Sequence, residues 1–192
     1  MRAFTTICAL IAVPLAAYAG DDAAKKAPAA GAPAVAPKAP PADPPKPTPA
    51  KELDMVKPFA KGWTCTGSNP KGDKLSAKMS FKLDLDKFWY AVRMDVVKNK
   101  VPSFTGMAWM GMDPAVKGGW IFEGADSHGG NIHLKATAAG VTAEQMVFEG
   151  EAADPAMGKA PMKFTFKLDG KTKHLSVVGE FGGQKGFEYD CK

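Results

Sequence analysis

The chain has 192 residues and a formal net charge of +5 at pH 7, and 23% of its residues are charged. Only two of the 25 basic residues are arginine, and the basic residues form no stripe. We therefore expect no nucleic-acid partner, because recognition of bases and phosphates favours arginine. No apolar run of about 18 residues occurs outside the amino terminus, so we also expect no helical membrane span.

The amino terminus has the pattern of a secretory signal peptide. A short basic start, Met1-Arg2, precedes an apolar run over residues 7–17, and Ala17-Tyr18-Ala19 is a small-x-small cleavage sequence. A membrane anchor is the alternative, but the apolar run is too short to span a bilayer. We expect residues 1–19 to be removed before Gly20 and the mature protein to be periplasmic or secreted.

The next segment, residues 20–51, is rich in proline, alanine and lysine. Such a composition cannot bury apolar area, so we expect an extended, disordered linker. It is either a simple tether or a spacer that reaches a partner or crosses the cell wall. Residues 52–192 then form the folded domain, at a length typical of one domain.

The mature chain retains two cysteines, Cys65 and Cys191, near opposite ends of this domain. An even cysteine count in an oxidising compartment favours a disulfide. Two free thiols, or a thiolate metal site, are the alternatives.

A short helix is expected before the first strand, over about residues 49–60. Thr48 is a helix-capping residue type, and Pro49 fits the first helical position. The apolar residues Leu53, Val56 and Phe59 follow at three-residue spacing. So brief a helix needs a surface to pack on, which a sheet would supply.

Strict alternation of apolar and polar residues dominates the rest of the chain. It is faultless over residues 75–85 and returns over residues 162–168, and period two is typical of a half-buried strand. Ten strands are expected in all: 62–67, 75–85, 88–97, 104–112, 119–125, 131–137, 141–149, 162–168, 172–181 and 184–191.

Short connections predict that successive strands are antiparallel neighbours. Asp169-Gly170 and Gly182-Gly183 are two-residue hairpin signals, and residues 126–130 form a longer turn. The predicted fold is therefore all-β: an antiparallel up-and-down meander of about ten strands. Closure into a barrel removes both unpaired edges, and a Cys65–Cys191 bond would join the same two ends. Alternation alone leaves open which face points inward, and an outer-membrane barrel with apolar residues outward is the alternative.

Two motifs carry a resemblance to known barrels. Gly62-Trp63, at the start of the first predicted strand, resembles the Gly-x-Trp opening of lipocalin-like (calycin) barrels, in which the tryptophan closes one barrel end. The second motif resembles the bacterial domain-of-unknown-function family 1579, and consists of Gly111, Asp113, Pro114, Trp120, Asp126 and Ser127, with Asp169-Gly170-Lys171 further on. The resemblance implies a secreted, lipocalin-like domain and no established activity. Met112 departs from it, since the family has an aromatic residue there.

Haem binding, copper binding and hydrolysis have partial sequence support. A nitrobindin-like barrel would need a histidine near its carboxyl end, but the last predicted strand has none, and His174 lies one hairpin earlier. Asp126-Ser127-His128 contains the residue types of a hydrolase triad, but consecutive residues do not converge on one point, so a turn is expected. Copper would use the three histidines with nearby methionines, which more often fill gaps in a core: His128, His133, His174, Met107, Met110 and Met112.

The favoured function is non-enzymatic binding of a small hydrophobic ligand inside the barrel. No nucleophile–base pair or metal cluster is placed by spacing, so no catalytic residue, metal or cofactor is expected. The residues expected to line a ligand cavity are Met79, Phe81, Met94, Trp109 and Phe122. Side chains could instead fill the interior.

The alternative is a structural module that docks a partner through residues 88–112. Residues 104–112 are apolar at both parities, which requires cover on both faces of the strand. A homodimer or another envelope protein could supply that cover. Exposure of Ala108, Met110 and Met112 within a single chain would favour this alternative.

Overall fold

A computed structural model describes residues 45–192 of the chain. The predicted signal peptide and residues 20–44 of the predicted linker lie outside the described residues. The described part begins without regular secondary structure, and its first helix starts at Lys51.

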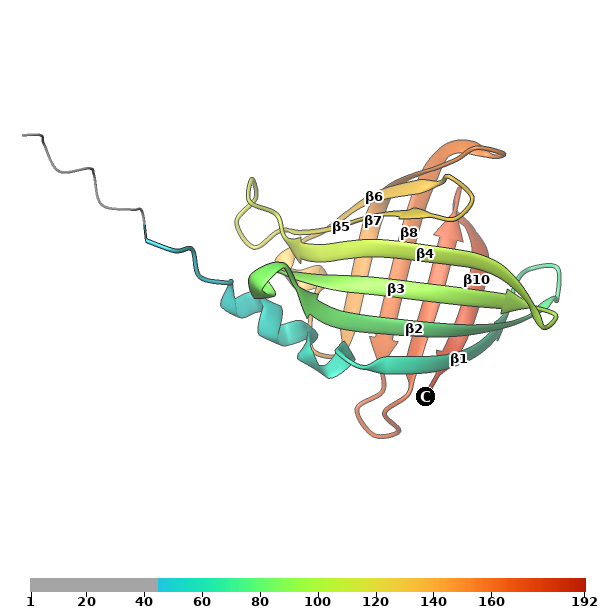
Figure 1. The fold of residues 1–192 in the computed structure, drawn as a ribbon, viewed down its shortest axis with the longest axis horizontal. Helices are drawn as coiled ribbons and strands as arrows, with labels where there is room; N and C mark the ends of the chain where they lie inside the picture. The colour runs from blue at the N-terminus through green and yellow to red at the C-terminus, as the bar shows by residue number, and fades with distance from the viewer. Residues whose placement is uncertain (1–44) are drawn as a thin grey trace, which may run out of the picture. The chain divides into compact units, whose positions relative to one another are not determined.

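Ten antiparallel strands form a closed barrel in simple meander order, as predicted (Figure 1). All ten lie close to their predicted ranges. They are β1 (Gly62–Ser68), β2 (Lys74–Asp84), β3 (Trp89–Lys98), β4 (Val101–Met112), β5 (Trp120–Asp126), β6 (Asn131–Ala136), β7 (Gln145–Asp154), β8 (Gly158–Leu168), β9 (Leu175–Phe181) and β10 (Gln184–Cys191). Three short 3-10 helices accompany them: η1 (Lys51–Phe59), η2 (Leu85–Lys87) and η3 (Ala138–Gly140).

The barrel closes where the first strand meets the last. Cys65 is paired directly with Cys191 across β1 and β10, and the two form the predicted disulfide. Thr64 and Lys192 exchange two backbone hydrogen bonds of 3.0 Å, so the ladder continues to the last residue of the chain. Closure leaves no unpaired strand edge.

The turns match the predictions with one exception. Gly182 and Gly183 form a two-residue hairpin loop with φ of 60° and 76°, in the left-handed region that such loops require. The two-residue turn predicted at Asp169-Gly170 is wrong. There β8 ends at Leu168 and β9 begins at Leu175, because the Asp169 carboxylate accepts hydrogen bonds from later backbone N–H groups and holds a longer loop.

The apolar face of the alternating strands points into the barrel. In β2, Ala77, Met79 and Phe81 are buried, whereas Lys78 and Lys82 are exposed. This arrangement is opposite to the outer-membrane alternative considered from the sequence. Among the described residues, no helix combines the length and hydrophobicity that crossing a membrane would need.

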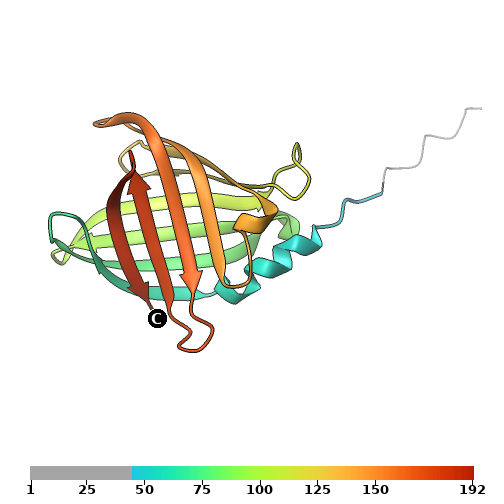
Figure 2. The ribbon, with the colours of Figure 1, turned by 180° about the vertical axis from the view of Figure 1, so that it is seen from behind.

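The helix η1 caps one end of the barrel, where β2 ends and β3 begins (Figures 1 and 2). Three of its apolar residues, Leu53, Val56 and Phe59, are at most 3% exposed. The Tyr90 hydroxyl donates to the Leu53 carbonyl at 3.3 Å, and the Trp63 indole donates to the Phe59 carbonyl at 3.0 Å. These contacts close this end, which we call the closed end.

Candidate functional site

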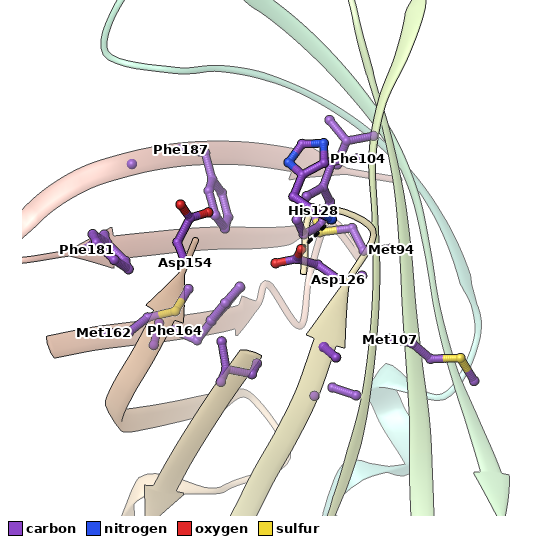
Figure 3. A pocket seen from close by; sticks show the side chains of 18 of the residues that line it. Met94, Phe104, Met107, Asp126, His128, Asp154, Met162, Phe164, Phe181 and Phe187 are labelled. Carbon is purple, nitrogen blue, oxygen red and sulfur yellow. Dashed lines mark hydrogen bonds between the residues drawn. The ribbon is translucent and has the colours of Figure 1, made fainter. Parts of the chain in front are cut away.

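A cavity of about 730 Å³ occupies the half of the barrel away from η1. In a meander, alternate connections lie at the same end. The cavity opens among the β1–β2, β3–β4, β5–β6, β7–β8 and β9–β10 loops, which form the opposite, open end. Figure 3 shows side chains from several strands converging on it.

The interior is hollow because several inward positions carry almost no side chain. These positions lie on the adjacent strands β4 and β5 and on β7: Gly106, Ala108, Gly124 and Ala152. At Gly124 a Cβ atom would come within 2.6 Å of the Ala108 Cβ, so the neighbouring strand approaches too closely for any larger residue. Small residues on this wall leave the space that larger ones would have filled.

An aromatic wall faces these small residues. Phe164 of β8 and Phe187 of β10 are both paired with Gly179 of the intervening strand β9, and their ring centroids lie 5.5 Å apart. A Cβ atom at Gly179 would collide with the Phe187 ring. Glycine at this position therefore allows the two rings to meet above β9. The wall continues through Tyr189, whose ring lies 5.4 Å from that of Phe187.

The charged side chains of the site lie at its mouth. Asp126 and Asp154 are the last residues of β5 and β7, and each carboxylate accepts two backbone N–H hydrogen bonds from the turn that follows it. Lys98, the last residue of β3, forms a 2.7 Å ion pair with Asp73. The His128 ring lies 5.8 Å from the Phe104 ring at the same rim (Figure 3). The lining thus changes from charged at the mouth to apolar inside.

Tyr189 is the polar group of the deeper wall. The residue lines the cavity and is only 3% exposed. Burial raises the pKa of the Tyr189 hydroxyl to about 12, because the phenolate would be poorly solvated there. The hydroxyl therefore stays protonated at every physiological pH.

Three of the five side chains predicted to line a ligand cavity do so. Met79, Met94 and Phe122 are part of its wall. Phe81 is a correction: it is buried beneath the cavity, with its ring 6.3 Å from Phe59 and 5.6 Å from Phe166.

Trp109 is a second correction, since it lies on the outer face of the barrel and is 38% exposed. Its neighbours on β4, Ala108 and Met110, are buried and take the inward parity. Met107 shares the outward parity and is 40% exposed, although the residue also borders the cavity (Figure 3).

The predicted end-closing motif lies at the closed end. Trp63 is 2% exposed and is hydrogen-bonded to η1 through its indole. Gly62, next to it, is the first residue of β1 and is exposed. Trp120 is also buried there, and its indole Nε1 is the one buried side-chain polar atom without a hydrogen-bond partner in residues 45–192.

Three further residues of the sequence motif lie at the end of β4 and in the loop that follows it. Gly111 lies under the Trp89 indole, where a Cβ atom would be 2.6 Å from the ring. Asp113 begins the β4–β5 loop, with Pro114 next in the turn. Asp113 accepts a hydrogen bond from the Ala115 N–H at 2.8 Å and forms a 3.3 Å ion pair with Lys135. The backbone hydrogen bond, and then the lysine, lower the pKa of Asp113.

The remaining motif residues form the predicted turn at the open end and do not resemble a triad. The Ser127 hydroxyl accepts from the Thr105 N–H at 3.0 Å, and the Ser127 N–H donates to the Thr105 carbonyl at 2.8 Å. The Asp126 carboxylate accepts from the backbone N–H groups of His128 and Gly130. Ser127 therefore holds the β5–β6 loop against β4, and Asp126 fixes the backbone of the loop itself.

The histidines and methionines considered for copper are distributed over the barrel. His128 is at the mouth, whereas His133 pairs with Glu123 at 3.6 Å and His174 with Asp190 at 3.3 Å, both on the exposed surface. Within the described range 45–192, no cluster of three histidine, cysteine or acidic side chains has the geometry of a metal site.

The exposure that would favour docking of a partner through residues 88–112 is not observed at Ala108, Met110 and Met112. Ala108 and Met110 are at most 5% exposed, and Met112 packs against the same core, so the barrel interior covers all three within one chain. Two large side chains on the outer face of β4, Met107 and Trp109, are exposed by 40% and 38%.

The aromatic wall of the site was not predicted from the sequence. Phe164, Phe187, Tyr189 and Met162 line the cavity, and none of them was predicted to do so. The sequence does contain a pattern that indicates these residues. Residues 162–168 alternate, and Phe187 and Tyr189 have the same parity as the buried half-cystine Cys191.

Comparisons with known proteins identify no family for this chain. No known family and no curated protein matches it. Among solved structures, a redesigned β-barrel, mFAP1, bound to DFHBI, aligns with 72% of this chain and 97% of its own length, at 9% identity and a TM-score of 0.42. That likeness is too weak to carry an argument. The class of the protein, a closed ten-stranded antiparallel barrel, follows from its own strand pairing, and the resemblance to family 1579 stays a prediction.

Proposed function

We propose that this protein is exported to the periplasm and holds a small apolar ligand inside its barrel without catalysing a reaction. The single observation that carries the proposal is the cavity of about 730 Å³ with an apolar interior, an aromatic wall and one open end. Cavities of about 300–1,000 Å³ with such linings are typical of small-molecule sites.

The shape of the site supports binding of a ligand rather than a filled core. Small residues at Gly106, Ala108, Gly124 and Ala152 maintain the space, although larger apolar residues are common at other inward positions. A ligand in the cavity would bury apolar surface against its walls, at about 25 cal/mol per Å².

Export is supported by the signal-peptide pattern of residues 1–19 and by the Cys65–Cys191 disulfide. Disulfides persist mainly in oxidising compartments such as the bacterial periplasm.

A non-catalytic role is supported by how the reactive groups of the mouth are used. The carboxylates of Asp126 and Asp154 accept hydrogen bonds from the loop backbone, and the Ser127 hydroxyl accepts from Thr105. None of the three is paired with a histidine side chain, which a nucleophile–base arrangement would require.

The test is a fluorescence titration of the full mature protein with N-phenyl-1-naphthylamine, an uncharged apolar dye. We expect saturable binding of one dye per barrel. Ala108→Phe places a ring inside the cavity and should weaken binding more than about tenfold, because it fills the space the dye occupies. The matched control is Ala91→Phe, which adds the same ring on the outer face of β3 and should leave the affinity unchanged.

Circular dichroism first establishes that both variants fold. If Ala108→Phe does not fold, Ala152→Leu tests the same space from β7. Absence of saturable binding to the wild-type protein, or equal affinities for the folded cavity variant and the control, would overturn the proposal.

A further inference from the structure

Tyr189 differs from every other polar residue of the cavity in its depth. The other polar or charged lining residues lie in the loops of the open end or within a few residues of it: Asn69, Lys71, Lys98, Ser103, Asp126, His128, Asn131 and Asp154. Tyr189 is the sixth of eight residues in β10, counted from the open end. Its hydroxyl is therefore the one side-chain hydrogen-bonding group that the described residues place in the inner part of the wall.

The Tyr189 hydroxyl has no hydrogen-bond partner among residues 45–192, and burial alone accounts for its raised pKa. The other tyrosine in this range, Tyr90, uses its hydroxyl to donate to Leu53 at the closed end. The hydroxyl is not a fully enclosed polar atom like the Trp120 Nε1, so it keeps some accessible surface in the cavity wall, where it can donate to a partner from outside the protein.

The surroundings of the hydroxyl define what such a partner can be. The rings of Phe164, Phe187 and Tyr189 contact one another in series. The ring centroids of Phe164 and Phe187 lie 5.5 Å apart, and those of Phe187 and Tyr189 lie 5.4 Å apart. Flat ring systems pack favourably against such a wall. A charged group would be desolvated there without an opposite charge, which is costly. An uncharged oxygen has a much smaller desolvation penalty, and a hydrogen bond from the Tyr189 hydroxyl would offset it.

We propose that Tyr189 selects the ligand: the cavity takes an uncharged, ring-containing molecule whose carbonyl-type oxygen, as in a ketone, quinone or ester, accepts a hydrogen bond from the Tyr189 hydroxyl. This inference rests on the proposed ligand-binding function and adds the chemical class of the ligand. The raised pKa supports it, because the hydroxyl stays protonated and remains a donor across the physiological pH range.

The experiment compares two uncharged naphthalene dyes on the full mature protein. Prodan (6-propionyl-2-dimethylaminonaphthalene) carries a ketone, and its emission shifts to longer wavelength when that ketone accepts a hydrogen bond. N-phenyl-1-naphthylamine carries no carbonyl group. The variant Tyr189→Phe removes only the hydroxyl, and Tyr90→Phe is the matched control, since it removes a hydroxyl that does not line the cavity.

We expect Tyr189→Phe to weaken Prodan binding by about five- to tenfold, the usual worth of one hydrogen bond, and to shift the emission of bound Prodan to shorter wavelength. Its affinity for N-phenyl-1-naphthylamine should not change. Tyr90→Phe should lower the melting temperature and leave both affinities as they are. The affinity of the wild-type protein for Prodan should be constant between about pH 6 and 10, because the hydroxyl does not ionise in that range.

The outcomes separate this inference from the proposed function. If neither dye binds, the proposed function fails and the inference fails with it. If N-phenyl-1-naphthylamine binds but Tyr189→Phe leaves the affinity and emission of Prodan unchanged, the cavity is a ligand site and only the role of Tyr189 is wrong. Equal loss of both dyes on Tyr189→Phe would also overturn the inference, since that pattern indicates a change in shape.

Discussion

Loss of the Cys65–Cys191 disulfide should destabilise the barrel more than any single change on its surface. The bond joins residues separated by 126 positions, and both half-cystines are fully buried. In the chain-entropy description, a cross-link that closes so long a loop stabilises the fold by about 5 kcal/mol, mainly by restricting the unfolded chain.

The disulfide lies where β1 and β10 close the barrel, so its loss weakens the strand pair on which closure depends. The β1–β10 ladder has four residue pairs besides the Thr64–Lys192 pair, whereas the β2–β3 ladder has ten. The strands that close the barrel are therefore held by few hydrogen bonds, and the cross-link keeps their ends together when the ladder opens. For a domain of this size, a loss of about 5 kcal/mol corresponds to a fall in melting temperature of roughly 10–20 °C.

The assay is thermal unfolding followed by circular dichroism on three samples: the oxidised protein, the same protein after reduction, and the variant Cys65→Ala/Cys191→Ala. Reduction breaks the covalent bond but keeps both sulfur atoms in the core, so it isolates the effect of the cross-link. The double variant also leaves a small void and should unfold at a slightly lower temperature than the reduced protein. A fall of less than about 3 °C in both samples would refute the reasoning that the cross-link stabilises the seam.

Four further predictions concern single residues. Phe59→Ala in η1 should cost about 3–5 kcal/mol in urea unfolding, because it empties the fully buried centre of the closed end; a cost below about 1 kcal/mol would show that the helix is not part of the core. Trp109→Ser, on the outer face, should change stability by less than about 0.5 kcal/mol and leave dye binding intact, and a loss of dye affinity would place this residue in the site after all. Gly179→Ala should lower both stability, by about 1–3 kcal/mol, and the affinity for naphthalene dyes, since its Cβ would displace the ring above it; unchanged values for both would contradict the close approach. Asp113→Asn should be less stable than wild type at about pH 6, and the difference in unfolding free energy should narrow as the pH falls below the ordinary carboxyl pKa of 3.8. The reason is that a carboxyl whose pKa is lowered by folding contributes stability above its unfolded pKa and loses that contribution in acid. A difference that widens in acid would contradict this prediction.

Much of the fold could be predicted from local sequence patterns. Period-two alternation in residues 75–85 and 162–168, with turn residues between successive runs, located all ten strands and their order. The alternation is reliable here because one face of each strand packs in the core and the other meets water.

The pattern failed where alternation is absent. Residues 104–112 are apolar at both parities, so nothing in the segment itself shows which side chains point inward. The prediction placed Trp109 inside because large apolar residues are usually buried. In the structure, β4 lies opposite Tyr90 and Val92 of β3, and those buried partners fix Met110 and Ala108 as the inward residues.

Whether the interior is hollow could not be predicted from the sequence. The cavity depends on which small residues lie next to one another on neighbouring strands, and this is a property of register rather than of any one strand. Gly124, for example, is paired with Ala108, so two positions without bulk adjoin each other. Gly179 contributes differently, since it makes room for the aromatic wall. The six-residue loop after Leu168 was missed for a related reason: a capping carboxylate, not the Asp-Gly pair, determines its length.

The most direct test of the account is methyl NMR of the mature protein with ¹³C-labelled methionine, titrated with N-phenyl-1-naphthylamine. Met79, Met94 and Met162 line the cavity, whereas Met55 lies in η1 at the closed end and is not part of the cavity wall. We predict saturable shifts of the three cavity methyl resonances and none of the Met55 resonance. Shifts confined to Met55, or no shifts at any of the four, would contradict the central claim that the barrel interior is the binding site.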